Sequence, residues 1–325
     1  MIINNGLGDN GNDDLINSNI KIMNSFNENN LPNLDVCVLA ALELFSSIEI
    51  PNVSIPYKRP LVVGSGNAIA SGKIIFAKTD AIFADESSVY EKLENISAID
   101  GVVLLSASGA KHAPIIAKLA KEKNKKVTLL TNTKNSEAEK YADKTYVFLK
   151  NREPYTYNTS TYMGMILGHT KEDPKKILHF IKNEIDSITL PDFSKIDKYF
   201  LIIPEEFYGV IRLLNVKFIE LFGRKVSRDI ETFEYITHAS TVVPSNELFI
   251  TFGKEGSEKQ QSLMGKNRLH IPLPKNADYA TMMAIGYYLV GKIQSCQPDY
   301  FKQNIGAYMK KASEVFEKEM KVIVE

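Results

Sequence analysis

The sequence has little cysteine, no excess charge of either sign and no long apolar run. Its two cysteines, Cys37 and Cys296, are too few for a disulfide framework or a zinc site, and such sparse use fits a reducing compartment. Lys and Arg total 39, as do Asp and Glu, so no basic excess attracts nucleic acid or anionic lipid. Without an apolar run of about 18 residues or a secretory leader, we expect a cytoplasmic protein with no membrane or nucleic-acid partner.

Length and composition are those of an ordinary globular protein. The chain has 325 residues, which suggests two domains or one large duplicated unit. Hydrophobic residues make up 44% and charged residues 24%, which argues against collagen-like, coiled-coil and fully disordered chains. Because the charge is balanced, a small and locally recognised ligand is favoured.

Strand and helix patterns divide the chain into four segments. Residues 1–56 form an arm whose start is rich in Asn and Asp and whose remainder has helical spacing, and we expect it to be a lid or a dimer contact. Residues 57–170 alternate apolar strands with helices, 171–196 form a connector, and 197–325 have the same layout. Strands made of continuous Val, Leu and Ile are buried on both faces, which predicts parallel sheets flanked by helices. The predicted fold class is α/β, with two doubly wound, flavodoxin-like parallel-sheet domains and an N-terminal helical arm.

Small and hydroxyl-bearing residues follow two of the predicted strands and lead into helices. At such loops, backbone N–H groups can approach an anion, hydroxyls donate further hydrogen bonds, and the helix N-terminus adds partial positive charge. A third group of hydroxyl-bearing residues, around Thr159 and Ser160, lies where a buried helix is predicted to begin. Helix capping explains these hydroxyls as well as ligand binding does. The residues predicted to cradle a phosphate are Gly64, Ser65, Gly66, Asn67, Ser106, Ser108 and Gly109, with Thr159 and Ser160 as further contacts.

A dinucleotide site is the rival interpretation of the first loop. Gly64 and Gly66 match the first two positions of a G-x-G-x-x-G fingerprint, and Asp85 lies about 20 residues on, where a ribose-binding acid is expected. The third glycine position of this fingerprint is Ile69, however, and a dinucleotide site gives the loop after the third strand no function.

Several stretches resemble the sugar isomerase (SIS) domain family. The run VVLLSASGAKHAPIIAKLAKEKNKKVTLLTN is similar to the family signature, in which a strand ends in Ser-x-Ser-Gly and the next strand ends in Thr-Asn. VVGSGNAIASG resembles the first glycine-rich loop, DESSVY the segment after the second strand, and EPYTYNTST the Glu-then-Ser/Thr stretch. CQPDYFKQN resembles the tail that closes the isomerase half of glucosamine-6-phosphate synthase and related tandem proteins. The resemblance covers residues 57–170 well and 197–305 loosely.

The resemblance implies a tandem-domain protein that binds a phosphorylated sugar and needs no cofactor. Carried over by position, Ser65, Ser106 and Ser108 contact the phosphate. In place of the commoner Ser-Gly-Glu-Thr motif of the family, this sequence has Ser-Gly-Ala-Lys. Lys111 either adds a point charge beside the phosphate or is a solvated residue at the start of a helix. In homodimers of this family a histidine can reach the partner's site, so a homodimer is expected.

Candidate catalytic groups come from the second unit. Aldose–ketose interconversion of a hexose or aminohexose 6-phosphate needs a base that moves a proton between adjacent carbons, and usually a group that opens the ring. Glu234 and His238 are four apart on a helix predicted near 231–239, so Glu234 is the predicted base and His238 the ring-opening group. Glu231 is the substitute base, and Lys302 corresponds approximately to a lysine that assists ring opening in the synthase. No metal is predicted, because hydrogen bonds can stabilise an enediol.

Three classes of function stay open at this point. The first is a phosphosugar isomerase or a related sugar-phosphate aminotransferase or deaminase. The second is a non-catalytic sugar-phosphate sensor, which ligand would stabilise without turnover. The third is a structural scaffold, which no hexose phosphate would stabilise. The sequence does not specify the sugar.

Overall fold

The first sheet is built from the apolar runs in the first half of the chain. In the computed structural model, which describes residues 18–238, 243, 245–315 and 317–325, this sheet has five parallel strands in the order β2-β1-β3-β4-β5. That order is the one found in flavodoxin-like sheets. The strands are β1 (Pro60–Val63), β2 (Ile82–Ala84), β3 (Gly101–Leu105), β4 (Val127–Thr131) and β5 (Lys144–Val147).

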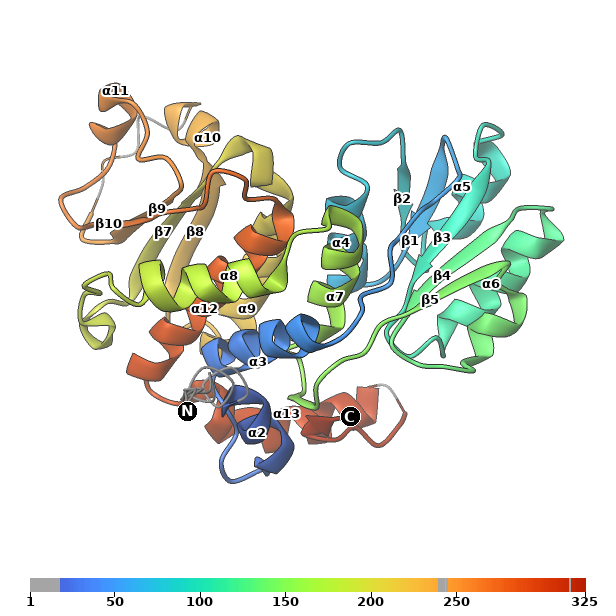
Figure 1. Cartoon of the computed structure of the whole chain (residues 1–325), viewed down its shortest axis with the longest axis horizontal. Helices are drawn as coiled ribbons and strands as arrows, with labels where there is room; N and C mark the ends of the chain where they lie inside the picture. Colours follow the sequence, from blue (N-terminus) through green and yellow to red (C-terminus); the bar gives the residue numbers. More distant parts are fainter. Residues whose placement is uncertain (1–17, 239–242, 244, 316) are drawn as a thin grey trace, which may run out of the picture.

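Helices cover both faces of this sheet, which is why every residue of its central strands β1, β3 and β4 is buried. Alternate residues of β3 belong to different buried clusters: Val102 and Leu104 face one way, and Val103 and Leu105 face the other. The first cluster includes α5 (Val89–Asn95), α6 (His112–Glu122) and the 3-10 helix η1 (Glu137–Tyr141), and the second includes α4 (Asn67–Ile75) and α7 (Thr159–Thr170). Figure 1 shows this arrangement.

The second sheet has four parallel strands in the order β10-β9-β7-β8. They are β7 (Lys198–Ile203), β8 (Ser227–Thr232), β9 (Leu248–Phe252) and β10 (Arg268–Ile271). The neighbouring helical elements are η4 (Glu205–Val210), α9 (Ile211–Phe222), α10 (Phe233–His238), α11 (Glu258–Gln261) and α12 (Tyr279–Cys296). The helix predicted near 231–239 is wrong at its start, because Glu231 lies in β8, where it pairs in register with Ile202 of β7. The predicted last residue, Ala239, lies outside the described residues.

In Figure 1, α4 and α7 lie between the two sheets, and a further group of helices packs against α7 from the side of the second sheet. This group contains α3 (Leu34–Ser47), α8 (Pro174–Phe180) with the π-helical turn η2 (Ile181–Ile185), and α12. The expectation that the N-terminal arm is a lid or dimer contact is wrong for α3, whose apolar side chains are buried in the interior. One continuous buried cluster includes residues of both sheets, among them Val103 and Leu201. The division into two domains with the boundaries given above stays a prediction.

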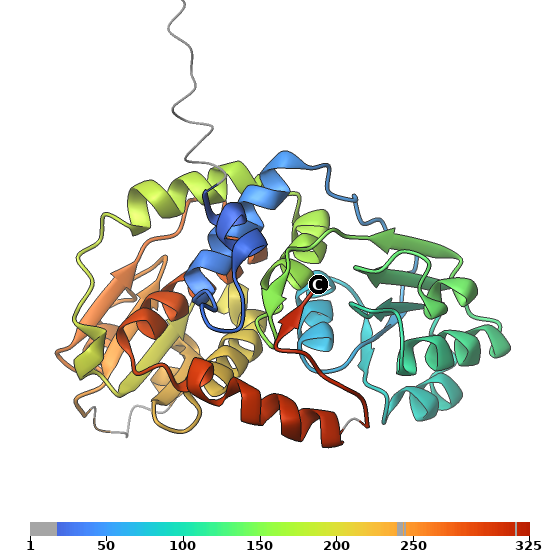
Figure 2. The same cartoon turned by 90° about the horizontal axis from the view of Figure 1, so that it is seen from below.

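The remaining elements include the two ends of the described chain. Helix α2 (Ser18–Ser25) is held on α3 by Glu43, which accepts hydrogen bonds from the backbone of Asn19 and Ile20. After η3 (Phe193–Lys195) and the second sheet, α13 (Tyr300–Val315) leads to a short strand, β11 (Ile323–Val324), which pairs antiparallel with β6 (Glu153–Pro154). Figure 2 shows this C-terminal segment, in red, running from the half that holds the second sheet to the half that holds the first. None of the described helices has the length and apolar character needed to span a membrane.

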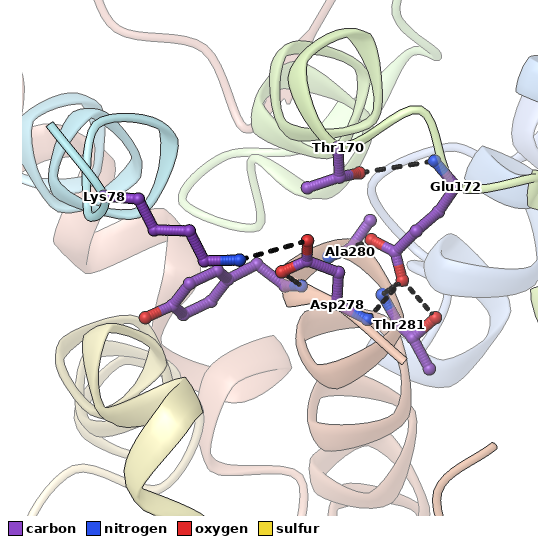
Figure 3. Close-up of polar contacts among 7 residues, drawn as sticks. Lys78, Thr170, Glu172, Asp278, Ala280 and Thr281 are labelled. Carbon is purple, nitrogen blue, oxygen red and sulfur yellow. Dashed lines mark hydrogen bonds and ion pairs between the residues drawn. The ribbon is translucent and has the colours of Figure 1, made fainter. Parts of the chain in front are cut away.

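Glu172, in the connector, caps a helix that is distant in sequence. Its carboxylate accepts hydrogen bonds from the backbone N–H groups of Asp278, Ala280 and Thr281 at 2.9, 2.8 and 3.1 Å, and from the Thr281 hydroxyl at 2.5 Å (Figure 3). These N–H groups begin α12 and have no partner within the helix. The Glu172 side chain therefore joins the start of the connector to the start of α12.

Replacing Glu172 by alanine is expected to lower the free energy of unfolding by about 1–3 kcal/mol, because the N–H groups at the start of α12 lose their acceptor in a partly buried place. Urea unfolding followed by circular dichroism measures this loss. Glu184→Ala is the matched control, since Glu184 is exposed in η2, and it should change the unfolding free energy little. A loss no larger than that of the control would contradict the capping role.

Candidate functional site

The two loops singled out in the sequence border one cavity of about 820 Å³. They follow β1 and β3, which are neighbours in the sheet, so their carboxyl ends meet at the same edge. The predicted residues that line the cavity are Gly64, Ser65, Gly66, Ser106, Ser108 and Lys111. Asn67 and Gly109 belong to the same loops but do not line it, and Thr159 and Ser160 lie elsewhere.

The loop after β3 is held in a tight turn by its own side chains. Ser106 Oγ accepts a hydrogen bond from the backbone N–H of Gly109 at 3.1 Å, and Ser108 Oγ accepts one from Ala110 N–H at 3.4 Å. Gly109 has φ +58°, in the left-handed region, and a Cβ there would collide with Ser136. Only glycine fits this position without distorting the loop.

The loop after β1 carries a hydroxyl that is engaged by a carboxylate. Ser65 donates a hydrogen bond to Glu86, which follows β2 and also lines the cavity. Asp85, the acid required by the dinucleotide interpretation, instead accepts hydrogen bonds from the backbone and hydroxyl groups of Ser87 and Ser88. These hydrogen bonds lower the pKa of Asp85 to about 2. A local turn thus accounts for Asp85, which weakens the dinucleotide interpretation.

Both loops present the beginning of a helix to the cavity with the same backbone conformation. Gly66 precedes α4 with φ 55° and ψ −118°, and Lys111 precedes α6 with φ 57° and ψ −114°. Positive φ is ordinary for glycine, whereas for lysine it costs conformational free energy. The N–H groups of two adjacent helix N-termini, together with serine hydroxyls and Lys111, favour an anion.

Thr159 and Ser160 serve a buried carboxylate and not the cavity. Glu153 accepts hydrogen bonds from the backbone N–H groups of both residues, at 2.6 Å each, and from the Ser160 hydroxyl at 2.5 Å. Burial raises the pKa of Glu153, and these hydrogen bonds oppose the shift. The alternative of helix capping therefore describes this stretch, with Glu153 as the capping side chain.

The structure places the predicted catalytic residues away from this cavity. Glu234 and His238 are exposed on α10, and neither lines the cavity. Glu231 lies on β8, where partial burial and Asp229 raise the pKa of its carboxyl. Lys302 is on α13, 3.5 Å from the carboxylate of Asp299, and is also outside the cavity. The catalytic roles of these four residues stay predictions, because a single copy of the chain does not bring them to the cavity.

The C-terminal tail, residues 317–325, supplies residues that the sequence analysis missed. Lys318 and Lys321 line the cavity, and so do Glu319 and Glu325 of the same tail. The tail is fixed by the pairing of β11 with β6, by a hydrogen bond from Tyr155 N–H to the Val322 carbonyl at 2.7 Å, and by one from Lys150 to the Glu325 carbonyl. The only local signal was a short apolar run, VIV, which does not indicate where the tail lies.

Glu220 is a second missed residue. It lies on α9 with 21% of its side chain exposed, and the ammonium of the fully buried Lys217 is 2.7 Å from its carboxylate. Burial raises the pKa of Glu220 above its ordinary value, and Lys217 opposes the shift. Glu220 does not line the cavity of the two loops; it lines a second cavity together with Thr156, the residue that follows Tyr155 of the first cavity in the sequence.

Comparison with known proteins identifies the fold. No family model and no curated protein sequence matches the chain. Among solved structures, the C-terminal domain of glucosamine-fructose-6-phosphate aminotransferase from Francisella tularensis has a TM-score of 0.54 at 14% identity, over 81% of this chain and 94% of that one. Tagatose-6-phosphate ketose/aldose isomerase from Escherichia coli has a TM-score of 0.54 at 11% identity, over 90% of each chain. The chain has the sugar isomerase fold.

A third structure with this fold is glucosamine-6-phosphate deaminase from Thermotoga maritima, with a TM-score of 0.51 at 14% identity, over 81% of this chain and 92% of that one. Within the sugar isomerase fold, the cavity of this chain lies where ligands bind to open parallel sheets, beyond the carboxyl ends of the strands. Among the described residues, no group of three or more His, Cys, Asp or Glu side chains is arranged to hold a metal ion.

Proposed function

We propose that this protein is an enzyme that interconverts the aldose and ketose forms of a hexose or aminohexose 6-phosphate. The observation that carries the proposal is the meeting of two serine-containing loops at one cavity, each at the start of a helix. In this proposal Ser65, Ser106 and Ser108 bind the phosphate with the backbone N–H groups of both loops, and Lys111 adds positive charge. Lys318 and Lys321 cover the ligand from the tail.

Glu220 is the proposed base. Its carboxylate takes the proton from the carbon beside the carbonyl group, the C–H electron pair forms the double bond of an enediolate, and the carbonyl electron pair moves to its oxygen. A proton then passes from the adjacent hydroxyl to that oxygen, and the carboxylic acid returns its proton to the former carbonyl carbon. A carboxylate with a raised pKa suits this task because its proton affinity is closer to that required near neutral pH. Glu234, by contrast, is exposed on α10 and does not line the cavity. His238 can act in ring opening only if a second copy of the chain brings it to this cavity.

The second candidate function is a non-catalytic sugar-phosphate sensor. One observation favours it: none of the four catalytic candidates drawn from the sequence lines the cavity. Thermal stabilisation and isomerisation assays with glucose, fructose, mannose and glucosamine 6-phosphates separate the two. Stabilisation with interconversion supports the isomerase, stabilisation without any turnover supports the sensor, and no stabilisation contradicts both.

Gly109→Ala is expected to weaken sugar-phosphate binding at least about tenfold, because the new Cβ must displace Ser136 and the turn that presents the serine hydroxyls. Calorimetric titration with the best ligand of the panel measures the effect. Gly306→Ala is the matched control, since a Cβ at that position on α13 meets nothing within 4 Å and should leave affinity unchanged. Equal affinity of both variants would contradict phosphate binding at this loop.

A further inference from the structure

The loop after β2 lies beside the loop after β1 at the edge of the first sheet (Figure 1). The two strands pair in register up to Val63 and Ala84, and the backbone N–H of Gly64 donates a hydrogen bond to the Ala84 carbonyl at 3.2 Å. The loops that follow therefore leave the sheet side by side. Each supplies a polar side chain to the cavity, Ser65 from the first and Glu86 from the second. The proposed function gives Glu86 no role.

The three serines proposed to bind the phosphate use their hydroxyl groups in opposite ways. Ser106 Oγ and Ser108 Oγ accept hydrogen bonds from backbone N–H groups, and no described residue accepts a hydrogen bond from either. Each of these two hydroxyls therefore keeps its proton for a ligand. Ser65 Oγ instead donates to the Glu86 carboxylate. A hydroxyl has one proton, so Ser65 cannot donate to a phosphate while it donates to Glu86.

The charge of Glu86 adds to this competition. An ionised carboxylate only accepts hydrogen bonds, as a phosphate dianion does, so neither group can donate to the other. A phosphate oxygen bound by Ser65 would lie beside a carboxylate oxygen bound by the same hydroxyl, and like charges at such a separation repel. Ser65 can therefore serve either the carboxylate or the phosphate, but not both.

The surroundings of Glu86 allow its side chain to leave while its backbone stays in place. Glu86 is exposed, and the hydrogen bond from Ser65 is the only polar contact of its carboxylate within the part of the chain that the structure describes. Its neighbour Asp85 accepts hydrogen bonds from the backbone N–H groups of Ser87 and Ser88 at 3.1 and 3.0 Å, which fixes the turn on both sides of Glu86. Rotation of the side chain into solvent thus breaks one exposed hydrogen bond and nothing else.

From these observations we propose that Glu86 is an internal competitor that regulates the phosphate site. In the empty protein its carboxylate takes the place beside Ser65 that a phosphate oxygen takes in the complex. Binding then includes displacement of Glu86, so the measured affinity is lower than the loops alone would provide. This proposal rests on the proposed function, because it takes Ser65 as a phosphate ligand.

Calorimetric titration of the full chain tests the competition, with inorganic phosphate and with the best hexose phosphate of the panel. Glu86→Ala should bind both ligands about 3–10-fold more tightly than the unsubstituted protein, because an exposed hydrogen bond to a charged group no longer has to be broken. The factor should be the same for both ligands, since the phosphate is the group that displaces Glu86. Glu91→Ala is the matched control: Glu91 is exposed on α5 and does not line the cavity, so its loss should leave both affinities unchanged.

The other outcomes separate this proposal from the proposed function. If the unsubstituted protein binds and converts a hexose phosphate but Glu86→Ala binds no more tightly, only the role of Glu86 is overturned. A gain of the same size in Glu91→Ala would also overturn it, because the effect would then come from net charge. Weaker binding of glucosamine 6-phosphate alone would show that Glu86 holds the amino group of the sugar, which contradicts the competition. Absence of binding by both proteins to every phosphate tested would overturn the proposed function as well.

A double-mutant cycle with Ser65→Ala shows whether Glu86 acts through the serine. If Glu86 competes by holding the Ser65 hydroxyl, the gain in affinity produced by Glu86→Ala should shrink when residue 65 is alanine, because no hydroxyl is left to release. The same gain in both backgrounds would mean that the carboxylate repels the phosphate by its charge alone, and the proposed competition for Ser65 would be wrong.

Discussion

Replacing Glu220 by glutamine is expected to lower kcat for aldose–ketose interconversion by about 10²–10⁴-fold, the usual contribution of a positioned general base. The amide keeps the shape of the side chain and cannot accept the proton. KM should change much less, because the carboxylate is proposed to act on the reacting carbon and not on the phosphate. Steady-state kinetics with the best substrate of the hexose phosphate panel measures both constants.

The matched control for this experiment is Glu234→Gln, the same chemical change at the base predicted from the sequence. Glu234 is exposed on α10 and lies outside the cavity, so its variant should retain kcat. If Glu234→Gln lost activity and Glu220→Gln kept it, the assignment of the base would be reversed. Glu220→Asp adds a second measurement: it keeps the charge beside the fully buried Lys217 but withdraws the carboxylate by one methylene group, so a large loss of kcat with little loss of stability is expected.

The pH dependence follows from the raised pKa of Glu220. The base must be ionised to take a proton, so kcat/KM should fall as the pH falls through the pKa of this group in the free enzyme. Because burial raises that pKa, the midpoint should lie above the ordinary glutamate value of 4.5. The limb should disappear in the residual activity of Glu220→Gln. A limb that persists in that variant belongs to another group.

The features that could be predicted from the sequence are those set by neighbouring residues. Continuous apolar runs identified β1, β3 and β4, and the small residues after β1 and β3 identified the loops at the cavity. The prediction that both loops face one cavity needed only the rule that parallel strands end at the same edge. Within these loops, the sequence did not reveal that Lys111 adopts the backbone conformation that glycine adopts at Gly66.

The features that could not be predicted depend on contacts between distant segments. The run that contains Glu231 reads as helical, but pairing with β7 makes it a strand, so Glu231 does not share a helix with Glu234. The local sequence does not distinguish Glu220 from an exposed glutamate on an amphipathic helix. One signal was available: positions 213, 214, 217, 218 and 221 of α9 share the buried face, which puts the charge of Lys217 in the interior and calls for a partner such as Glu220.

Deleting residues 318–325 is expected to raise KM for the sugar phosphate by about 10–100-fold, because both tail lysines and the cover of the cavity are lost together. Kinetics and direct titration of the deletion variant measure this change. The deletion also removes β11 and the buried Val322, so its melting temperature must be determined alongside.

The separate variants Lys318→Ala and Lys321→Ala leave β11 in place. They show how much of the rise in KM comes from losing the lysine charges and how much from uncovering the cavity. If charge alone holds the ligand, the two substitutions together should reproduce the KM of the deletion. If the tail also excludes water from the reacting carbon, the deletion should lower kcat further than the substitutions do, because the proposed enediolate would then face solvent. Lys311→Ala, an exposed lysine of α13 outside the first cavity, is the control. A KM that stays the same after deletion would mean that the tail does not touch the ligand, and the positive charge of the site would then come from Lys111 and the two helix N-termini alone.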